Sequence, residues 1–169
     1  MNTSTLTGRE TAEIQGTLKV IATPVGATEG FVIVNQVENK IMDEAKAFVL
    51  SAIYDPSFVP DPINYFMVGN EGTATPAGAD PKPVGGDRTG LFGPIVAGYT
   101  NTVSAPALSD GGKVATFSFS IPDTDLNGEY INEVGMFRDS DALFNMKTFS
   151  SILKTSGFSL TFIWTIRHK

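Results

Sequence analysis

The fold is decided by the stretch FSLTFIWTIR, which occupies residues 158–167. Large apolar side chains alternate with smaller or polar ones along it, so one face of an extended strand carries Phe158, Leu160, Phe162, Trp164 and Ile166. Two more strand-like runs precede this stretch, at residues 131–137 and 144–149. Because an apolar strand face must be covered, the pattern predicts a sheet stacked on a second layer.

The same period of two recurs further upstream. In residues 114–121 one strand face carries Ala115, Phe117, Phe119 and Ile121. Shorter alternating or β-branched runs occupy residues 14–20, 31–34 and 63–68. We therefore predict a mainly β fold, in the form of an antiparallel β-sandwich.

One segment has a helical period instead. Apolar residues recur every three or four positions at Ile41, Met42, Ala45, Phe48, Val49, Ala52 and Ile53. Asn39 stands where an N-cap residue would, and the prolines from Pro56 onward forbid further helix. We predict one short α-helix, from about Asn39 to Ile53.

The length of 169 residues suits a single domain. Residues 1–13 are polar and Thr-rich, with Leu6 as their apolar anchor, so we expect a flexible N-terminal arm before a single β-sandwich domain at residues 14–169. Within that domain, residues 69–113 are rich in Gly and Pro and form a long loop. A loop of that length more often binds a partner than stays idle, so we expect it at an interface.

Composition excludes several classes of protein. The chain carries 18 acidic and 12 basic residues, and its net charge of −6 argues against a nucleic-acid-binding protein. No apolar run approaches the roughly 20 residues of a membrane helix. The absence of cysteine excludes disulfides and thiolate metal sites, and the first residues do not resemble a secretion signal. We expect a protein that stays in the cytoplasm or is assembled there into something larger.

Enzyme signatures are mostly absent. The single histidine, His168, is penultimate, so a catalytic triad would have to be built at the end of the chain. Residues 85–90, GGDRTG, superficially resemble a phosphate-binding loop but lack its Gly-Lys-Ser/Thr ending. Glu133 lies in an apolar run, where a catalytic role needs a second acid and a structural role needs a turn or a lysine such as Lys147 or Lys154 as partner. We favour the structural role and predict neither catalytic residues nor a cofactor.

The sharpest chemical candidate is the sequence DTDLNG at residues 123–128. Asp123, Asp125 and Asn127 match the first ligands of a helix-loop-helix calcium site, with glycine in sixth place. The twelfth position should be a bidentate glutamate but is Val134, and both flanks have strand patterns. We favour a hairpin connection in which Gly128 takes a positive φ angle, with a weak calcium site as the alternative.

An ordered set of motifs resembles the small β domains of tail fibres, collars and baseplates of tailed bacteriophages. The resemblance covers roughly residues 14–167 and is carried by four groups of residues. The first group is Ile63, Tyr65, Val68, Gly69 and Gly72. The second is Thr89, Gly90 and Leu91, and the third is Val114 and Phe117. The last is Ile131, Glu133, Gly135, Met136, Phe137, Lys147, Phe149, Lys154, Thr155, Phe158, Leu160, Phe162, Trp164 and Ile166.

The resemblance implies a non-enzymatic virion protein that is assembled in the host cytoplasm and works as a homo-oligomer, possibly a trimer. Its partners would be other virion proteins, with no nucleic acid and no membrane. Because the chain stops at Lys169, we expect no fibre shaft and no receptor-binding tip. This leaves a tail, baseplate or collar component to which a fibre attaches, with a capsid decoration protein as the alternative. We expect the partner interface at Leu6, Pro76, Pro81, Pro83, Arg88, Leu91 and Phe92.

Two other classes remain open on the sequence. A carbohydrate-binding or hydrolytic β domain would need exposed aromatic residues or paired carboxylates. Only the first could be supplied, by Tyr54, Tyr65, Tyr99 and Tyr130. The other class is a soluble β domain of non-viral origin, since short motifs also match by chance.

Overall fold

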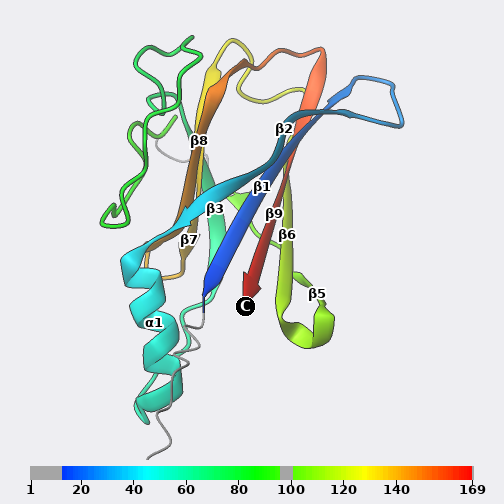
Figure 1. Ribbon diagram of the computed structural model, residues 1–169. Helices are drawn as coiled ribbons and strands as arrows, with labels where there is room; N and C mark the ends of the chain where they lie inside the picture. The colour runs from blue at the N-terminus through cyan, green and yellow to red at the C-terminus, as the bar shows by residue number, and fades with distance from the viewer. Residues whose placement is uncertain (1–12, 96–100, 169) are drawn as a thin grey trace, which may run out of the picture.

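The computed structural model of the chain describes residues 13–95 and 101–168. In these ranges the chain forms nine strands, one α-helix and one 3-10 turn (Figure 1). The strands are β1 (Ile14–Pro24), β2 (Phe31–Ile41), β3 (Ile63–Gly69), β4 (Asn101–Thr102), β5 (Ala107–Ser109), β6 (Val114–Ile121), β7 (Tyr130–Arg138), β8 (Leu143–Leu153) and β9 (Phe158–His168). The helix α1 spans Asp43–Tyr54, and the 3-10 turn η1 spans Asp110–Gly112.

All nine strands belong to one antiparallel sheet, in the order β4-β3-β7-β8-β2-β1-β9-β6-β5. The sheet is curled into a half-barrel, so that β3, β7 and β8 lie opposite β1, β9 and β6 (Figure 1). The predicted mainly β, antiparallel fold is confirmed. Its two layers, however, are halves of one sheet rather than the separate sheets of a β-sandwich. The reason is β2, which pairs with β1 along most of its length and with β8 at Lys40 and Ile41.

The main core lies between the two halves of the sheet. The apolar faces predicted for β6 and β9 point into it, and Leu160, Phe162 and Trp164 are fully buried. The ring of Phe66 from β3 stacks on that of Phe119 from β6, with centroids 3.4 Å apart. Contacts between opposite halves therefore close the core, as the alternating pattern predicts.

The helix begins later than the sequence predicts. β2 continues to Ile41, and the N-cap residue is Met42, whose side chain makes no capping hydrogen bond. Asn39 lies inside β2. With its amide oriented so that the oxygen faces the indole, it accepts from the N–H of Trp164 and donates to the carbonyl of Gly16. The predicted N-cap at Asn39 is wrong because a buried indole N–H needs a partner, and Asn39 supplies it.

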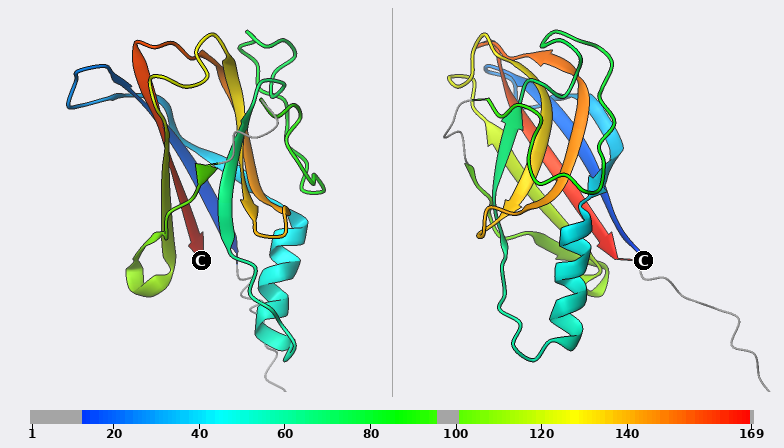
Figure 2. Two further views of the ribbon diagram at one scale, coloured as in Figure 1. Left: turned by 180° about the vertical axis from the view of Figure 1, so that it is seen from behind. Right: turned by 90° about the vertical axis from the view of Figure 1, so that its left-hand side faces the viewer.

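The long loop after β3 lies against the outer side of β7 and β8 (Figure 2). Residues 70–95 contain no helix or named strand, only isolated bridges of Gly69 with Pro94 and of Thr73 with Pro81. The loop predicted at residues 69–113 is nevertheless too long, because residues 101–112 contain β4, β5 and η1. Two hydroxyl groups of β8 bind the loop: Thr148 donates to the carbonyl of Lys82 and Ser150 donates to that of Ala79, each at 2.6 Å. The loop is therefore an ordered cover on one half of the sheet.

Candidate functional site

The start of the long loop is held by Asn132 in β7, whose side chain is fully buried. Its amide oxygen accepts from the backbone N–H of Gly72 at 2.7 Å. Its amide nitrogen lies 2.8–3.2 Å from four acceptors, which are the carbonyls of Asn70 and Pro76 and the hydroxyls of Thr73 and Ser151. One buried amide thereby organises the first turn of the loop.

The end of the loop is held by the next residue, Glu133. Its fully buried carboxylate accepts from the backbone N–H groups of Phe92 at 2.8 Å and Gly93 at 2.7 Å. Adjacent strand residues normally face opposite sides, but β7 has a register shift between Ile131 and Glu133. The expected structural role of Glu133 as the partner of a turn is what the structure shows, while Lys154 is engaged elsewhere.

The residues expected at a partner interface differ in how exposed their side chains are. Leu91 is buried in the small core beneath α1, so its side chain is not available to a partner. The ring of Phe92 is half-buried and faces two cations, Arg88 at 3.7 Å and Lys82 at 5.1 Å from its centroid. The remaining expected interface residues in the described ranges are the exposed Pro76, Pro81 and Pro83, whereas Leu6 lies outside them.

The turn at residues 123–128 is built around a lysine. The ammonium group of Lys154 donates to the carbonyls of Asp123 at 3.2 Å and Thr155 at 2.9 Å, and to Oδ1 of Asn127 at 3.2 Å. Gly128 has a φ angle of +92°, as predicted for a hairpin connection. Burial lowers the pKa of Lys154, and the nearby charges of Asp123 and Asp125 oppose that shift. The Lys154 ammonium thus contacts one predicted calcium ligand, Oδ1 of Asn127, together with the backbone carbonyl of Asp123.

A second buried cation, Arg138, was not singled out from the sequence. Its guanidinium pairs with Glu44 of α1 at 3.0 Å and with Asp61 at 3.3 Å, and lies 4.4 Å from the ring centroid of Phe48. Arg138 thereby ties the helix and the segment before β3 to the end of β7. The sequence gives no signal for this, since its partners are 94 and 77 residues away along the chain.

Tyr65, a candidate carbohydrate platform, has a structural role. Its ring stacks on Phe137 at a centroid distance of 5.2 Å, and its hydroxyl donates to Asp141 at 2.7 Å. Burial, together with the hydrogen bond and charge of Asp141, raises the pKa of Tyr65 to about 12. Tyr99 and the side chain of Tyr54 lie outside the described part. Of the four tyrosines considered for carbohydrate binding, this leaves Tyr130 beside Tyr65.

A cavity of about 460 Å³ lies between α1 and the adjoining ends of β1 and β2, and its lining includes His168, Glu13 and Glu38.

Within residues 13–95 and 101–168, no three histidine, aspartate or glutamate side chains come together as a metal site. In the described part of the chain no α-helix begins after the glycine-rich residues 85–90, so they lack the setting of a phosphate-binding loop. In the described part of the chain no helix is long and apolar enough to cross a bilayer.

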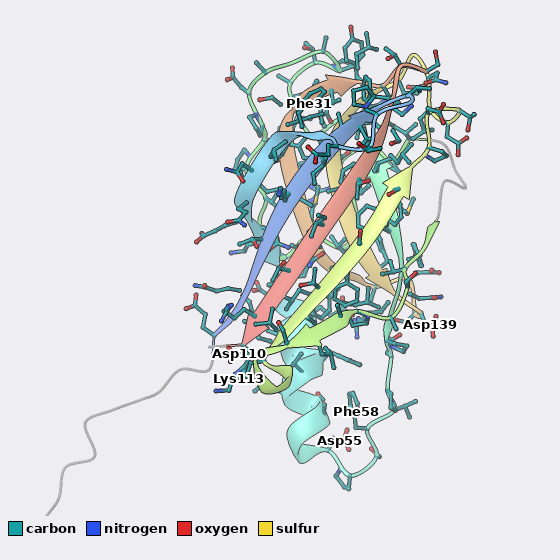
Figure 3. The ribbon with its side chains drawn as sticks, turned by 90° about the vertical axis from the view of Figure 1, so that its right-hand side faces the viewer. Phe31, Asp55, Phe58, Asp110, Lys113 and Asp139 are labelled. Atoms are coloured by element: carbon teal, nitrogen blue, oxygen red, sulfur yellow. The ribbon has the colours of Figure 1, made fainter. Side chains whose placement is uncertain are left out.

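Large apolar side chains are exposed on the β1–β2 hairpin. Val25 is 61% exposed, Phe31 58%, Val32 44% and Ile33 38%. Phe31 lies at the opposite end of the molecule from Asp55 and Phe58, which lie beside the lower part of the helix (Figure 3). We call Val25, Phe31, Val32 and Ile33 the hairpin patch. Such a group of exposed apolar residues is typical of a contact surface.

Comparisons of the chain with protein-family models, with curated proteins and with solved structures find no match. The functional argument therefore rests on the geometry above and on the sequence motifs.

Proposed function

We propose that this chain is a structural protein of a tailed-bacteriophage virion, a small component of the tail, baseplate or collar that acts through contacts with other virion proteins. The hairpin patch is the observation that carries the proposal. Water-exposed Phe31, Val32 and Ile33 are costly for a protein that acts alone, and burying each against a neighbour contributes roughly 1.5–3 kcal/mol at full burial.

The body behind the patch suits such a role. Asn132 and Glu133 fix both ends of the long loop to β7 through hydrogen bonds of 2.7 Å or slightly more, so the loop needs no further ordering when a partner binds. A rigid body with fixed loops loses little conformational entropy on assembly. The motif set that resembles tail-fibre, collar and baseplate domains is the reason for proposing a phage tail as the assembly.

The proposal is tested by following an affinity-tagged copy during infection by the phage that carries the gene. We expect the tagged chain to band with purified virions in a density gradient. Phe31→Asp should reduce its incorporation, whereas Leu108→Asp should not, since Leu108 is at least as exposed but lies on β5 at the edge of the sheet. A chain that stays in the soluble fraction, with both variants folded, would refute the proposal.

A further inference from the structure

The half-barrel has an opening between β2 and β8. The two strands pair only at Lys40 with Met146 and at Ile41 with Asn145, and β2 then follows β1 away from β8. Residues 31–39 of β2 therefore have no strand partner on that edge among the described segments. An unpaired edge exposes backbone N–H and C=O groups that can pair with an added strand.

The facing edge of β8 is already occupied. The backbone N–H of Ser151 donates to the carbonyl of Gly78 at 3.0 Å, and the hydroxyl of Thr148 donates to that of Lys82. The long loop thus covers β8, and of the two edges that border the opening β2 is the one left free.

The opening is positively charged at its closed end. A cleft of about 410 Å³ lies there, and its lining includes Lys40, Lys82 and Lys147 but only one carboxylate, that of Glu38. The cleft lining therefore carries an excess of positive charge, whereas the whole chain has a net charge of −6. Within residues 13–95 and 101–168 none of these three ammonium groups forms an ion pair, since the four ion pairs found involve other cations.

The other end of the free edge is apolar. It consists of Phe31, Val32 and Ile33, which are exposed on both faces of the strand. Between the two ends β2 is irregular, because its pairing with β1 shifts register twice near Val34 and Gln36 has a φ angle of +41°. A second copy paired through the same edge would bring the lysine end against either the apolar end or another lysine end. Neither arrangement supplies a carboxylate to these lysines, which disfavours a second copy as the occupant.

We propose that the free edge of β2 binds an extended, acidic segment of a partner protein, which adds as a strand alongside β2 and faces the long loop that covers β8. Its carboxylates lie among Lys40, Lys82 and Lys147, and its apolar side chains cover Phe31 to Ile33. These two parts of the segment are about five residues apart, because the two register shifts let the seven residues from Val32 to Asn39 span only the five from Ile21 to Gly16 of β1. The inference rests on the proposed function, since it names the chemistry of an assembly partner.

The test uses a synthetic ten-residue peptide that alternates Glu and Thr in one half and Val and Thr in the other, with both ends blocked. We expect it to bind the whole chain, with affinity that falls as salt is raised. Lys40→Glu should weaken binding about five- to tenfold, because it replaces an attraction by a repulsion. Lys113→Glu, an exposed lysine away from the cleft, is the matched control.

Amide hydrogen exchange gives the second readout. Bound peptide should slow exchange in residues 31–39 of β2 and leave β5 unchanged. Equal binding of a peptide with Lys in place of Glu, an unaffected Lys40→Glu variant, or self-association through β2 would overturn the inference. Virion incorporation is scored separately: a chain that bands with virions but does not bind the peptide contradicts this inference alone, and one that binds the peptide but is absent from virions contradicts the proposed function alone.

Discussion

Glu133 and Gly69 face each other across β7 and β3, and the Glu133 carboxylate occupies the space that a Cβ atom on Gly69 would need. The carbonyl of Gly93 closes the same space from the side of the loop. The glycine thus allows a carboxylate to pass over β3 and reach the backbone N–H groups of Phe92 and Gly93. One strand pair and the end of the long loop therefore depend on each other.

Gly69→Ala should destabilise the protein. Its methyl group would clash with Glu133 and with a backbone carbonyl that can move only if the loop moves, so the free energy of unfolding should fall by about 1–3 kcal/mol. Urea denaturation measures the change. Gly90→Ala is the matched control, because no atom lies within 4 Å of its added Cβ, and its midpoint should be unchanged or slightly higher.

Glu133→Gln should loosen the end of the loop. Its amide oxygen can accept from one of the two N–H groups, but its amide nitrogen faces the other, at a cost of about 1–3 kcal/mol. Hydrogen exchange at Phe92 and Gly93 should accelerate more than exchange in β9. Glu29→Gln, at an exposed position in the β1–β2 turn, should change neither. Unaltered protection of both amides would contradict the anchoring role.

Lys154→Met should open the turn at residues 123–128. Methionine fills a similar volume but leaves the carbonyls of Asp123 and Thr155 without this donor, which costs about 1–3 kcal/mol. Lys113→Met, at an exposed site, is the control. The wild-type melting temperature should be the same with calcium and with chelator, and a rise with calcium would show that the turn binds the metal ion.

Tyr65 should make the protein less stable at alkaline pH. Its pKa is raised from 10.0 to about 12 in the folded state, so over that interval the unfolded chain loses a proton that the folded chain keeps. The stabilisation by Tyr65 is complete below pH 10.0 and is lost as the pH rises to about 12. Urea midpoints at neutral pH and at a pH of about 11 should differ more for the wild type than for Tyr65→Phe. An equal difference in both proteins would contradict the assignment.

The sequence predicts the strands with regular alternation well. The apolar faces of β6 and β9 are confirmed, because in these strands every second residue enters one core. The extension of β2 to Ile41 was missed, since Glu38, Asn39 and Lys40 are polar and lie where the sheet opens to solvent. The same extension shifts the helix start and joins the two layers into one sheet.

The anchoring residues were predictable only in part. Glu133 stands out as a carboxylate in an apolar run, and its partner was expected to be a turn or a lysine. The identity of that turn depends on Phe92 and Gly93, which are 41 and 40 residues away. Lys154 and Arg138 were likewise out of reach, because burial of a cation among oxygens from distant segments has no local pattern.

Gold labelling of a tagged copy on purified virions distinguishes the proposed tail role of this chain from its alternatives. Electron microscopy should show the label at the tail end or at the neck of the particles. Label spread over the head would contradict the tail assignment in favour of capsid decoration, and unlabelled particles would contradict the account as a whole.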